Sequence, residues 1–213
     1  EDYALFMAIK DSESGRCLLD WEPRLRRREK AALEKVKKEL SRDILFYKTL
    51  QFWFFSQWKD LKTYANRKGI KIIGDLPIYV SADSADVWAN PEEFQVGKEG
   101  KPKRVAGTPP DAFSETGQLW GNPLYDWDKM KENGYTWWKK RITASSELFD
   151  SVRIDHFRAF DEYYSIPAAS DTAAKGKWCK GPGIEFFRAI KKETENIDII
   201  AEDLGLLTDS VLK

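Results

Sequence analysis

The chain has 213 residues, which is enough for one domain with a sizeable core, and its 35 basic side chains balance its 35 acidic ones. This balance favours a neutral substrate and gives no reason to expect nucleic acid or an anionic membrane as a partner. With two cysteines and one histidine, the chain is expected to have no disulfide framework, metal site or organic cofactor. The sequence shows no membrane span or signal peptide, and together with the few cysteines this predicts a cytoplasmic protein.

The first part of the chain is predicted to be helical. A helical pattern opens over residues 3–9, and a basic helix with a solvated face follows over about 24–40. A third helix is expected from Ser41 to about Lys68, where Gly69 ends it. The apolar side chains of this third helix cover more than one stripe, so we expect it to be buried on two sides.

Three later segments are predicted to be strands that each end in an acidic residue. The first covers residues 70–75 and ends at Asp75, the second leads to Asp155, and the third leads to Glu202. Helices are expected between them, over about 134–149 and 184–195. Strands that alternate with helices in this way predict an α/β architecture with a parallel sheet.

Two excursions interrupt the alternation of strands and helices. Eighty positions separate Asp75 from Asp155, whereas a βαβ step needs only about 30 residues. The surplus is rich in turn-forming and aromatic residues, and we predict an inserted excursion over about 83–130 that passes above the strand ends, with a hairpin around Gly97–Gly100. A second excursion is predicted over 162–183.

The segment from Val152 to Arg158 carries the clearest indication of chemistry. Side chains alternate along a strand, so Arg153 and Asp155 are expected on one face, where the guanidinium favours an ionised carboxylate. Such an aspartate at the carboxyl end of a barrel strand is a suitable nucleophile. Together with Glu202 it would supply the two carboxyl groups that cleavage of a glycosidic bond requires.

Five segments of the sequence together resemble the 4-α-glucanotransferases, the family that includes amylomaltase and the disproportionating enzyme. In chain order they are GDLPIYVSADSADVWANPEEF (74–94), GTPPDAFSETGQLWGNPLY (107–125), VRIDHFRAF (152–160), GKWCKGPG (176–183) and IIAEDLG (199–205). The resemblance extends from Glu1 to Lys213. It implies an α-amylase-like (β/α)8 barrel, of which this chain holds about three strands. It also implies transfer of α-1,4-glucan segments between maltodextrins with retention of configuration.

The resemblance implies roles for individual residues as well. Asp155 corresponds to the nucleophile of the family and Glu202 to its general acid/base. Arg153 and His156 correspond to positions that line the cleavage site, where they can orient the nucleophile and the sugar hydroxyls. Asp75 corresponds to the first acidic residue of the barrel motifs, and we expect it to hold hydrogen bonds of the site or to serve as a structural turn residue.

A mobile loop over the bound glucan is implied for residues 107–125. In it, Asp111 corresponds to a ligand of sugar hydroxyls, and Phe113 and Trp120 correspond to stacking platforms, because flat rings pack on the apolar faces of sugars. Packing within the loop is the alternative role for all three residues.

The resemblance covers only part of the family's barrel. The third carboxylate of the family lies on a later strand, so we expect this chain to be an excised piece whose exposed barrel edges favour self-association. Two alternatives to a glucanotransferase are therefore kept: an α-glucan hydrolase on the same scaffold, and a fragment that binds glucan without turnover.

Overall fold

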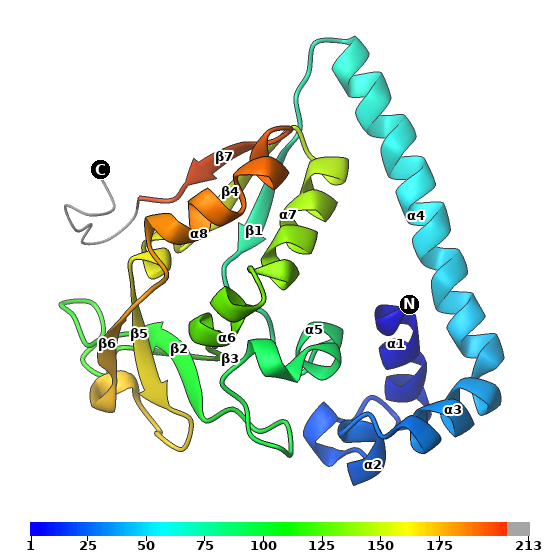
Figure 1. Cartoon of the computed structure of the whole chain (residues 1–213), viewed down its shortest axis with the longest axis horizontal. Helices are drawn as coiled ribbons and strands as arrows, with labels where there is room; N and C mark the ends of the chain where they lie inside the picture. The colour runs from blue at the N-terminus through cyan, green and yellow to red at the C-terminus, as the bar shows by residue number, and fades with distance from the viewer. Residues whose placement is uncertain (204–213) are drawn as a thin grey trace.

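The computed structural model describes residues 1–203 of the chain, and its N-terminal part is helical (Figure 1). The elements are α1 (Asp2–Ser12), the 3-10 turn η1 (Leu18–Asp20), α2 (Pro23–Arg26), α3 (Lys30–Glu39) and α4 (Ser41–Arg67). The single basic helix expected over 24–40 is wrong, because Arg28 has a left-handed backbone with φ 56° between α2 and α3. The Arg28 side chain donates to Asp2 at 2.7 Å and lies 4.2 Å over the Trp88 ring, and these tertiary contacts favour the break.

Helix α4 is not buried on two sides, contrary to the expectation from its pattern. Within the described structure none of its residues is buried. It meets α1 and α3 near its start and the end of α7 (Thr136–Leu148) near its own end, and Figure 1 shows it standing beside the body like a strut. Trp58 Nε1 donates to the Leu148 carbonyl at 2.7 Å, and Lys62 Nζ donates to the Phe149 carbonyl at 2.8 Å. Only one flank of α4 thus finds described partners, and the aromatic side chains of the other flank face solvent.

A parallel sheet holds the three strands that the sequence predicts. The strands are β1 (Ile73–Pro77), β4 (Ser151–Asp155) and β7 (Asp198–Ala201), in the order β1-β4-β7. The pairs Asp75↔Arg153 and Pro77↔Asp155 set the register of β1 against β4. In the described part of the chain this sheet is open, with β1 and β7 at its edges.

The two excursions contribute to one antiparallel sheet, which the sequence did not predict. Its strands are β2 (Arg104–Thr108), β3 (Gln118–Pro123), β5 (Glu162–Pro167) and β6 (Lys177–Lys180), in the order β3-β2-β5-β6. The hairpin expected around Gly97–Gly100 is a tight turn closed by one bridge, Val96↔Pro102. The longer hairpin is formed by β2 and β3, which are joined by residues 109–117.

Short helices connect the strands of the two sheets. They are α5 (Ala85–Ala89), η2 (Pro91–Glu93), α6 (Trp127–Glu132), α7, η3 (Phe157–Phe160), η4 (Ala173–Lys175), α8 (Ile184–Ala189) and η5 (Lys191–Thr194). The helix expected over 184–195 is therefore two shorter pieces. No helix of the described residues has the length and apolarity that crossing a membrane would take.

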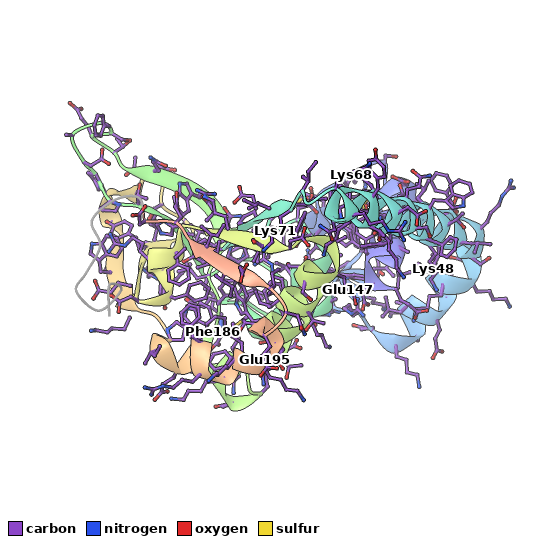
Figure 2. All side chains as sticks on the ribbon, turned by 90° about the horizontal axis from the view of Figure 1, so that it is seen from above. Lys48, Lys68, Lys71, Glu147, Phe186 and Glu195 are labelled. Atoms are coloured by element: carbon purple, nitrogen blue, oxygen red, sulfur yellow. The ribbon has the colours of Figure 1, made fainter. Side chains whose placement is uncertain are left out.

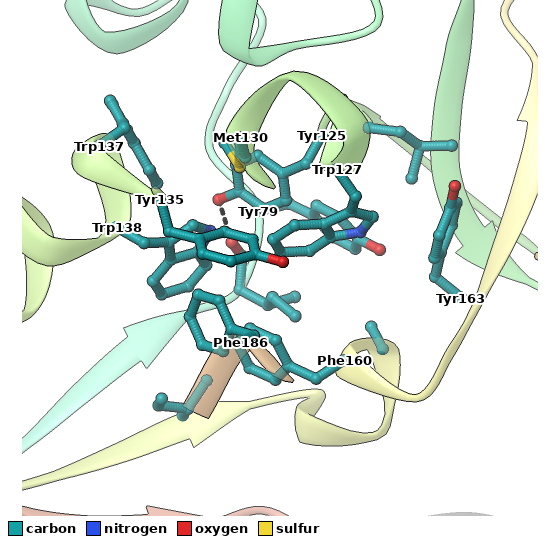
Figure 3. Close-up of a cluster of buried hydrophobic side chains, with 14 of the residues drawn as sticks. Tyr79, Tyr125, Trp127, Met130, Tyr135, Trp137, Trp138, Phe160, Tyr163 and Phe186 are labelled. Carbon is teal, nitrogen blue, oxygen red and sulfur yellow. Dashed lines mark hydrogen bonds between the residues drawn. The ribbon is translucent and has the colours of Figure 1, made fainter. Parts of the chain in front are cut away.

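A core of aromatic side chains joins the helices to the end of β4 (Figure 3). The Phe160 ring stacks on Phe186 with 4.7 Å between centroids, and Trp138 packs edge-on against both. The buried Tyr125 hydroxyl donates to the Ile78 carbonyl and so ties the chain after β1 to this core. Because Phe160 ends η3, the core fixes the turn that directly follows Asp155 and His156.

Candidate active site

The candidate active site lies where β4 and β7 end. Val152 and Ile154 of β4 are buried, and Arg153 and Asp155 alternate with them on the other face, as the period of a strand dictates. The chain passes from β7 to Glu202, whose backbone N–H donates to the Ile154 carbonyl at 3.2 Å. Parallel pairing of two adjacent strands thus brings Asp155 and Glu202 to the same edge of the sheet.

The Arg153 guanidinium links three carboxylates. Its Nη1 donates to Asp75 Oδ1 at 2.7 Å, and its Nη2 donates to Asp155 Oδ1 at 2.8 Å and to Glu202 Oε1 at 2.9 Å. The hydrogen bond to Asp75, followed by the one to Asp155, raises the pKa of Arg153, so the guanidinium stays charged. Because one nitrogen is shared, the bonded oxygens of Asp155 and Glu202 lie less than about 6 Å apart, which suits the ~5 Å spacing of a retaining pair.

The two paired carboxylates differ in exposure. The Asp155 side chain is 46% exposed and the Glu202 side chain only 12%. Asp155 can therefore meet a substrate from the open side, while Glu202 is held deeper between the strand ends. The Asp75 side chain is 66% exposed, and the contact recorded for its carboxylate is the ion pair with Arg153. These positions suit Asp75 to setting the orientation of Arg153.

His156 directly follows Asp155 in the chain and contacts Glu202 through its backbone. Its backbone is left-handed, with φ 55° and ψ 43°, and its N–H donates to Glu202 Oε2. Its ring makes an edge contact with Trp120 at 4.9 Å. Burial, followed by the nearby charge of Arg158, lowers the pKa of His156 to about 4, so the imidazole is neutral at pH 7. A neutral ring can both donate and accept a hydrogen bond.

A pocket of about 190 Å³ opens beside Asp155. Its lining consists of Pro77, Ile78, Tyr79, Trp120, Asn122, Asp155 and His156. The structure thus brings Trp120, Asp155 and His156 together at one pocket. Sequence reasoning missed Tyr79 and Asn122 as lining residues. Both lie inside the quoted family segments. The sequence around Asn122, Gly121-Asn122-Pro123, is also typical of a turn, so it did not single out a lining residue. In the structure the Asn122 side-chain amide donates to the Val80 carbonyl at 2.9 Å.

Asp111 and Phe113 do not line this pocket. Asp111 Oδ1 accepts from the backbone N–H groups of Phe113 and Ser114 at 2.8 Å each, so its carboxylate shapes its own loop. The Phe113 side chain is 99% exposed at the tip of the β2–β3 hairpin, which Figure 2 shows as the green loop that protrudes from the body. The structure therefore presents Phe113 as a free apolar surface on a preformed turn.

Within residues 1–203 the structure contains no cluster of three or more His, Cys, Asp or Glu side chains that could hold a metal ion. The groups that the structure places at the strand ends are two adjacent carboxyl groups, a shared guanidinium, a neutral imidazole and aromatic rings.

Comparison with known proteins identifies the family to which the chain belongs. A family model described as 4-alpha-glucanotransferase, glycoside hydrolase family 77, matches residues 1–213. The chain belongs to this family. The 4-alpha-glucanotransferase of Clostridium butyricum is 50% identical over 214 residues, and that of Thermus thermophilus is 49% identical over 211 residues. The chloroplastic/amyloplastic 4-alpha-glucanotransferase of Solanum tuberosum is 47% identical over 213 residues.

Solved structures of the family share the fold. The chain superimposes on amylomaltase from Streptococcus agalactiae in complex with acarbose with a TM-score of 0.95 and 44% identity. Amylomaltase from Corynebacterium glutamicum, at 20% identity, shares the fold with a TM-score of 0.79.

The family members are longer than this chain. The alignments take in 99% or 100% of this chain, but only 44% of the Clostridium protein, 42% of the Thermus protein and 37% of the Solanum protein. The two solved structures are covered to 43% and 27% of their chains. The chain thus spans less than half the length of these relatives.

Proposed function

We propose that this chain is the part of a 4-α-glucanotransferase that carries the nucleophile and the general acid/base. The observation that carries the proposal is the shared Arg153 nitrogen, which joins Asp155 and Glu202 at the ends of adjacent strands. The substrates are α-1,4-linked maltodextrins, a choice supported by family membership and by the relative that was solved in complex with acarbose.

The reaction proceeds by two displacements with retention. The Asp155 carboxylate attacks the anomeric carbon of the donor glucan while Glu202 gives its proton to the leaving glycosidic oxygen. This step forms a glucosyl ester on Asp155 and releases the shortened glucan. Glu202, now a carboxylate, removes the proton of a 4-hydroxyl on the acceptor glucan, and that oxygen displaces Asp155 to form the new α-1,4 bond. Arg153 keeps both carboxyl groups in place throughout.

The β2–β3 hairpin provides a cover that favours a sugar acceptor over water. Trp120 stands at the pocket beside His156, and Phe113 is exposed on the hairpin tip. In this proposal Trp120 stacks on a sugar ring at the cleavage site, and Phe113 contacts the glucan once it is bound. Asp111, which shapes the hairpin loop, turns an oxygen toward sugar hydroxyls.

The proposal also includes the larger architecture and the compartment. The three parallel strands are taken as consecutive members of a (β/α)8 barrel, and residues 83–130 as an excursion inserted into it. Within residues 1–203, β1 and β7 are the edges of the parallel sheet, and copies of this chain associate through them. A cytoplasmic location remains a prediction, since relatives with chloroplastic/amyloplastic names match equally along the chain.

The proposal is tested by incubating the purified chain with maltotriose and resolving the products by length. Asp155→Asn is assayed beside it, because the amide keeps the side-chain shape and lacks the nucleophilic charge. Asp203→Asn serves as the matched control, since Asp203 is an exposed carboxylate next to Glu202 that the mechanism does not use. We expect glucose together with a ladder of longer maltodextrins, lost in Asp155→Asn and kept in Asp203→Asn.

Other outcomes select the alternatives. Glucose and maltose without longer products would indicate an α-glucan hydrolase. A folded chain that yields no products but binds maltodextrin in calorimetry would be a glucan-binding fragment. Full turnover in Asp155→Asn would refute the assignment of the nucleophile.

A further inference from the structure

Among residues 1–203, the donors to the Glu202 carboxylate come from β4 and from the residue that directly follows it. Arg153 Nη2 donates to Oε1 at 2.9 Å, and the backbone N–H of His156 donates to Oε2. The backbone N–H of Glu202 itself donates to the Ile154 carbonyl at 3.2 Å. Each carboxylate oxygen therefore has its own donor, one in the strand that carries Asp155 and the other in the residue that directly follows Asp155.

The donor at Oε2 depends on an unusual backbone. His156 has φ 55° and ψ 43°, a left-handed conformation that non-glycine residues adopt at a cost. It directly follows β4 and turns the chain into η3, where the Ala159 N–H donates to the His156 carbonyl at 3.0 Å. Because β4 stops here, the N–H of His156 is outside the β ladder and free to meet a side chain. Left-handed residues held by their surroundings cluster at functional sites.

We propose that His156 is a positioning residue whose main-chain N–H, presented by this left-handed turn, fixes the Glu202 carboxyl group at the angle its acid/base role needs. The inference rests on the proposed function of Glu202. It assigns His156 a second contribution, made by its backbone, in addition to any contact of its imidazole with a sugar.

The surroundings of His156 explain how the turn is maintained. Trp120 of β3 contacts the imidazole at 4.9 Å, and the Trp120 Nε1 donates to Gln118 at 3.0 Å, which fixes the indole. On the other side, η3 is anchored in the core by Phe160. The turn is thus held from the antiparallel sheet and from the aromatic core. The Glu202 carboxyl is thereby linked, through His156, to β3, the strand that carries Trp120.

The single histidine makes a direct test possible. A chain labelled with ¹⁵N-histidine has one backbone amide resonance from histidine, that of residue 156. Its amide proton shift is followed from pH 3 to pH 8 in the chain as it is, in Glu202→Gln and in the control Asp203→Asn. Glutamine keeps an acceptor oxygen but has no carboxyl proton to lose, so it separates hydrogen bonding from titration. The imidazole protons are recorded in parallel.

Titrating neighbours are separated by the same comparison. Asp155 and Asp75 face Glu202 through Arg153, and the imidazole of His156 titrates as well. Their effects on the amide shift persist in Glu202→Gln. We expect the His156 amide shift to change with pH by a larger amount in the unmodified chain and in Asp203→Asn than in Glu202→Gln, where the contribution of the Glu202 carboxyl group is lost and that of its neighbours remains.

A step of unchanged size in Glu202→Gln, or a flat curve in the unmodified chain, would overturn the inference. The maltotriose assay reports separately on the proposed function, because the amide step needs no turnover. A chain that fails to extend maltotriose yet shows the step keeps the positioning contact and loses only the proposed activity.

Discussion

The imidazole of His156 is largely shielded from water and lies near charged side chains, so its pKa reports on how deeply the ring is buried. Burial lowers its folded-state pKa from 6.5 to about 4. Between these values the unfolded chain binds more protons, so the free energy of unfolding from this group falls as the pH drops from 6.5 to 4. The contribution is complete above pH 6.5, lost below pH 4, and amounts to at most about 3 kcal/mol.

Two measurements check this prediction. The imidazole proton shift in NMR should titrate with a midpoint near the lowered pKa of about 4. Urea unfolding of His156→Asn, which has no titrating ring and tolerates a left-handed backbone, should show a weaker loss of stability between pH 6.5 and 4. A midpoint at the value of a free histidine would contradict the buried ring.

Trp120 is the neighbour whose removal should change the environment of His156 most directly. The two rings are in edge contact at 4.9 Å. Trp120→Ala opens the imidazole to water, so we expect its pKa to rise from about 4 toward the value of a free histidine. Phe113→Ala removes an equally apolar ring from the 99% exposed loop tip and should leave the pKa unchanged. Equal shifts in both variants would show that the contact with Trp120 is not what shields the ring.

At the scale of elements, the β2–β3 hairpin depends on a glycine for its close pairing. A Cβ on Gly107 would collide with the Gln118 carbonyl of β3 and lie 2.6 Å from Ile166 Cδ1 of β5. Gly107→Ala should therefore lower the free energy of unfolding by about 1–3 kcal/mol. Gly97→Ala is the control, since its nearest contact is the Lys101 carbonyl at 3.7 Å. Urea unfolding that gives the two variants equal stability would contradict the tight pairing.

Lys62, near the end of α4, holds this helix to the C-terminal end of α7. Lys62 Nζ donates to the carbonyls of Ser146 at 3.1 Å and Phe149 at 2.8 Å, where a positive charge also favours the helix dipole. Lys62→Met should cost about 1–2 kcal/mol in denaturant unfolding and speed amide hydrogen exchange in the second half of α4. Lys59→Met, on an exposed position of the same helix, should change neither measurement.

Patterns of neighbouring residues predicted several of the helices and the parallel strands. They did not predict features that depend on contacts between segments far apart in the chain. An apolar run that ends in Asp75 or Asp155 is readable from neighbouring residues, and so the parallel strands were predicted. The antiparallel sheet joins Arg104 to Pro167 across the chain, and no short window contains that register. The left-handed turn at His156 and the exposed flank of α4 likewise depend on what packs against them. For the site, the residue types indicated the chemistry, but the geometry around Glu202 required the paired strands.

At the scale of the whole molecule, apolar surface gathers on α4. Large side chains on this helix are half or more exposed: Leu45 at 63%, Phe52 at 68%, Trp53 at 57% and Tyr64 at 62%. Exposed apolar surface of this kind marks places where proteins associate. In the part of the chain that the structure describes, β1 is an edge strand with one side unpaired, and its Ile73 is exposed to 62%. The chain should therefore associate with further copies of itself.

Sedimentation velocity over a hundredfold range of concentration measures this association. We expect the weight-average mass to rise with concentration above the 24.7 kDa of one chain. Phe52 and Phe55 lie on one face of α4, three residues apart, so changing both to Lys should shift the rise to higher concentration. Ile73→Lys, which blunts the β1 edge, tests the sheet in the same way. Phe113→Lys, on the hairpin tip, should leave the curve unchanged.

A chain that stays at the mass of one copy throughout would refute the association. An effect of Ile73→Lys alone would assign it to the sheet edge, and an effect of the α4 variant alone would assign it to the helix.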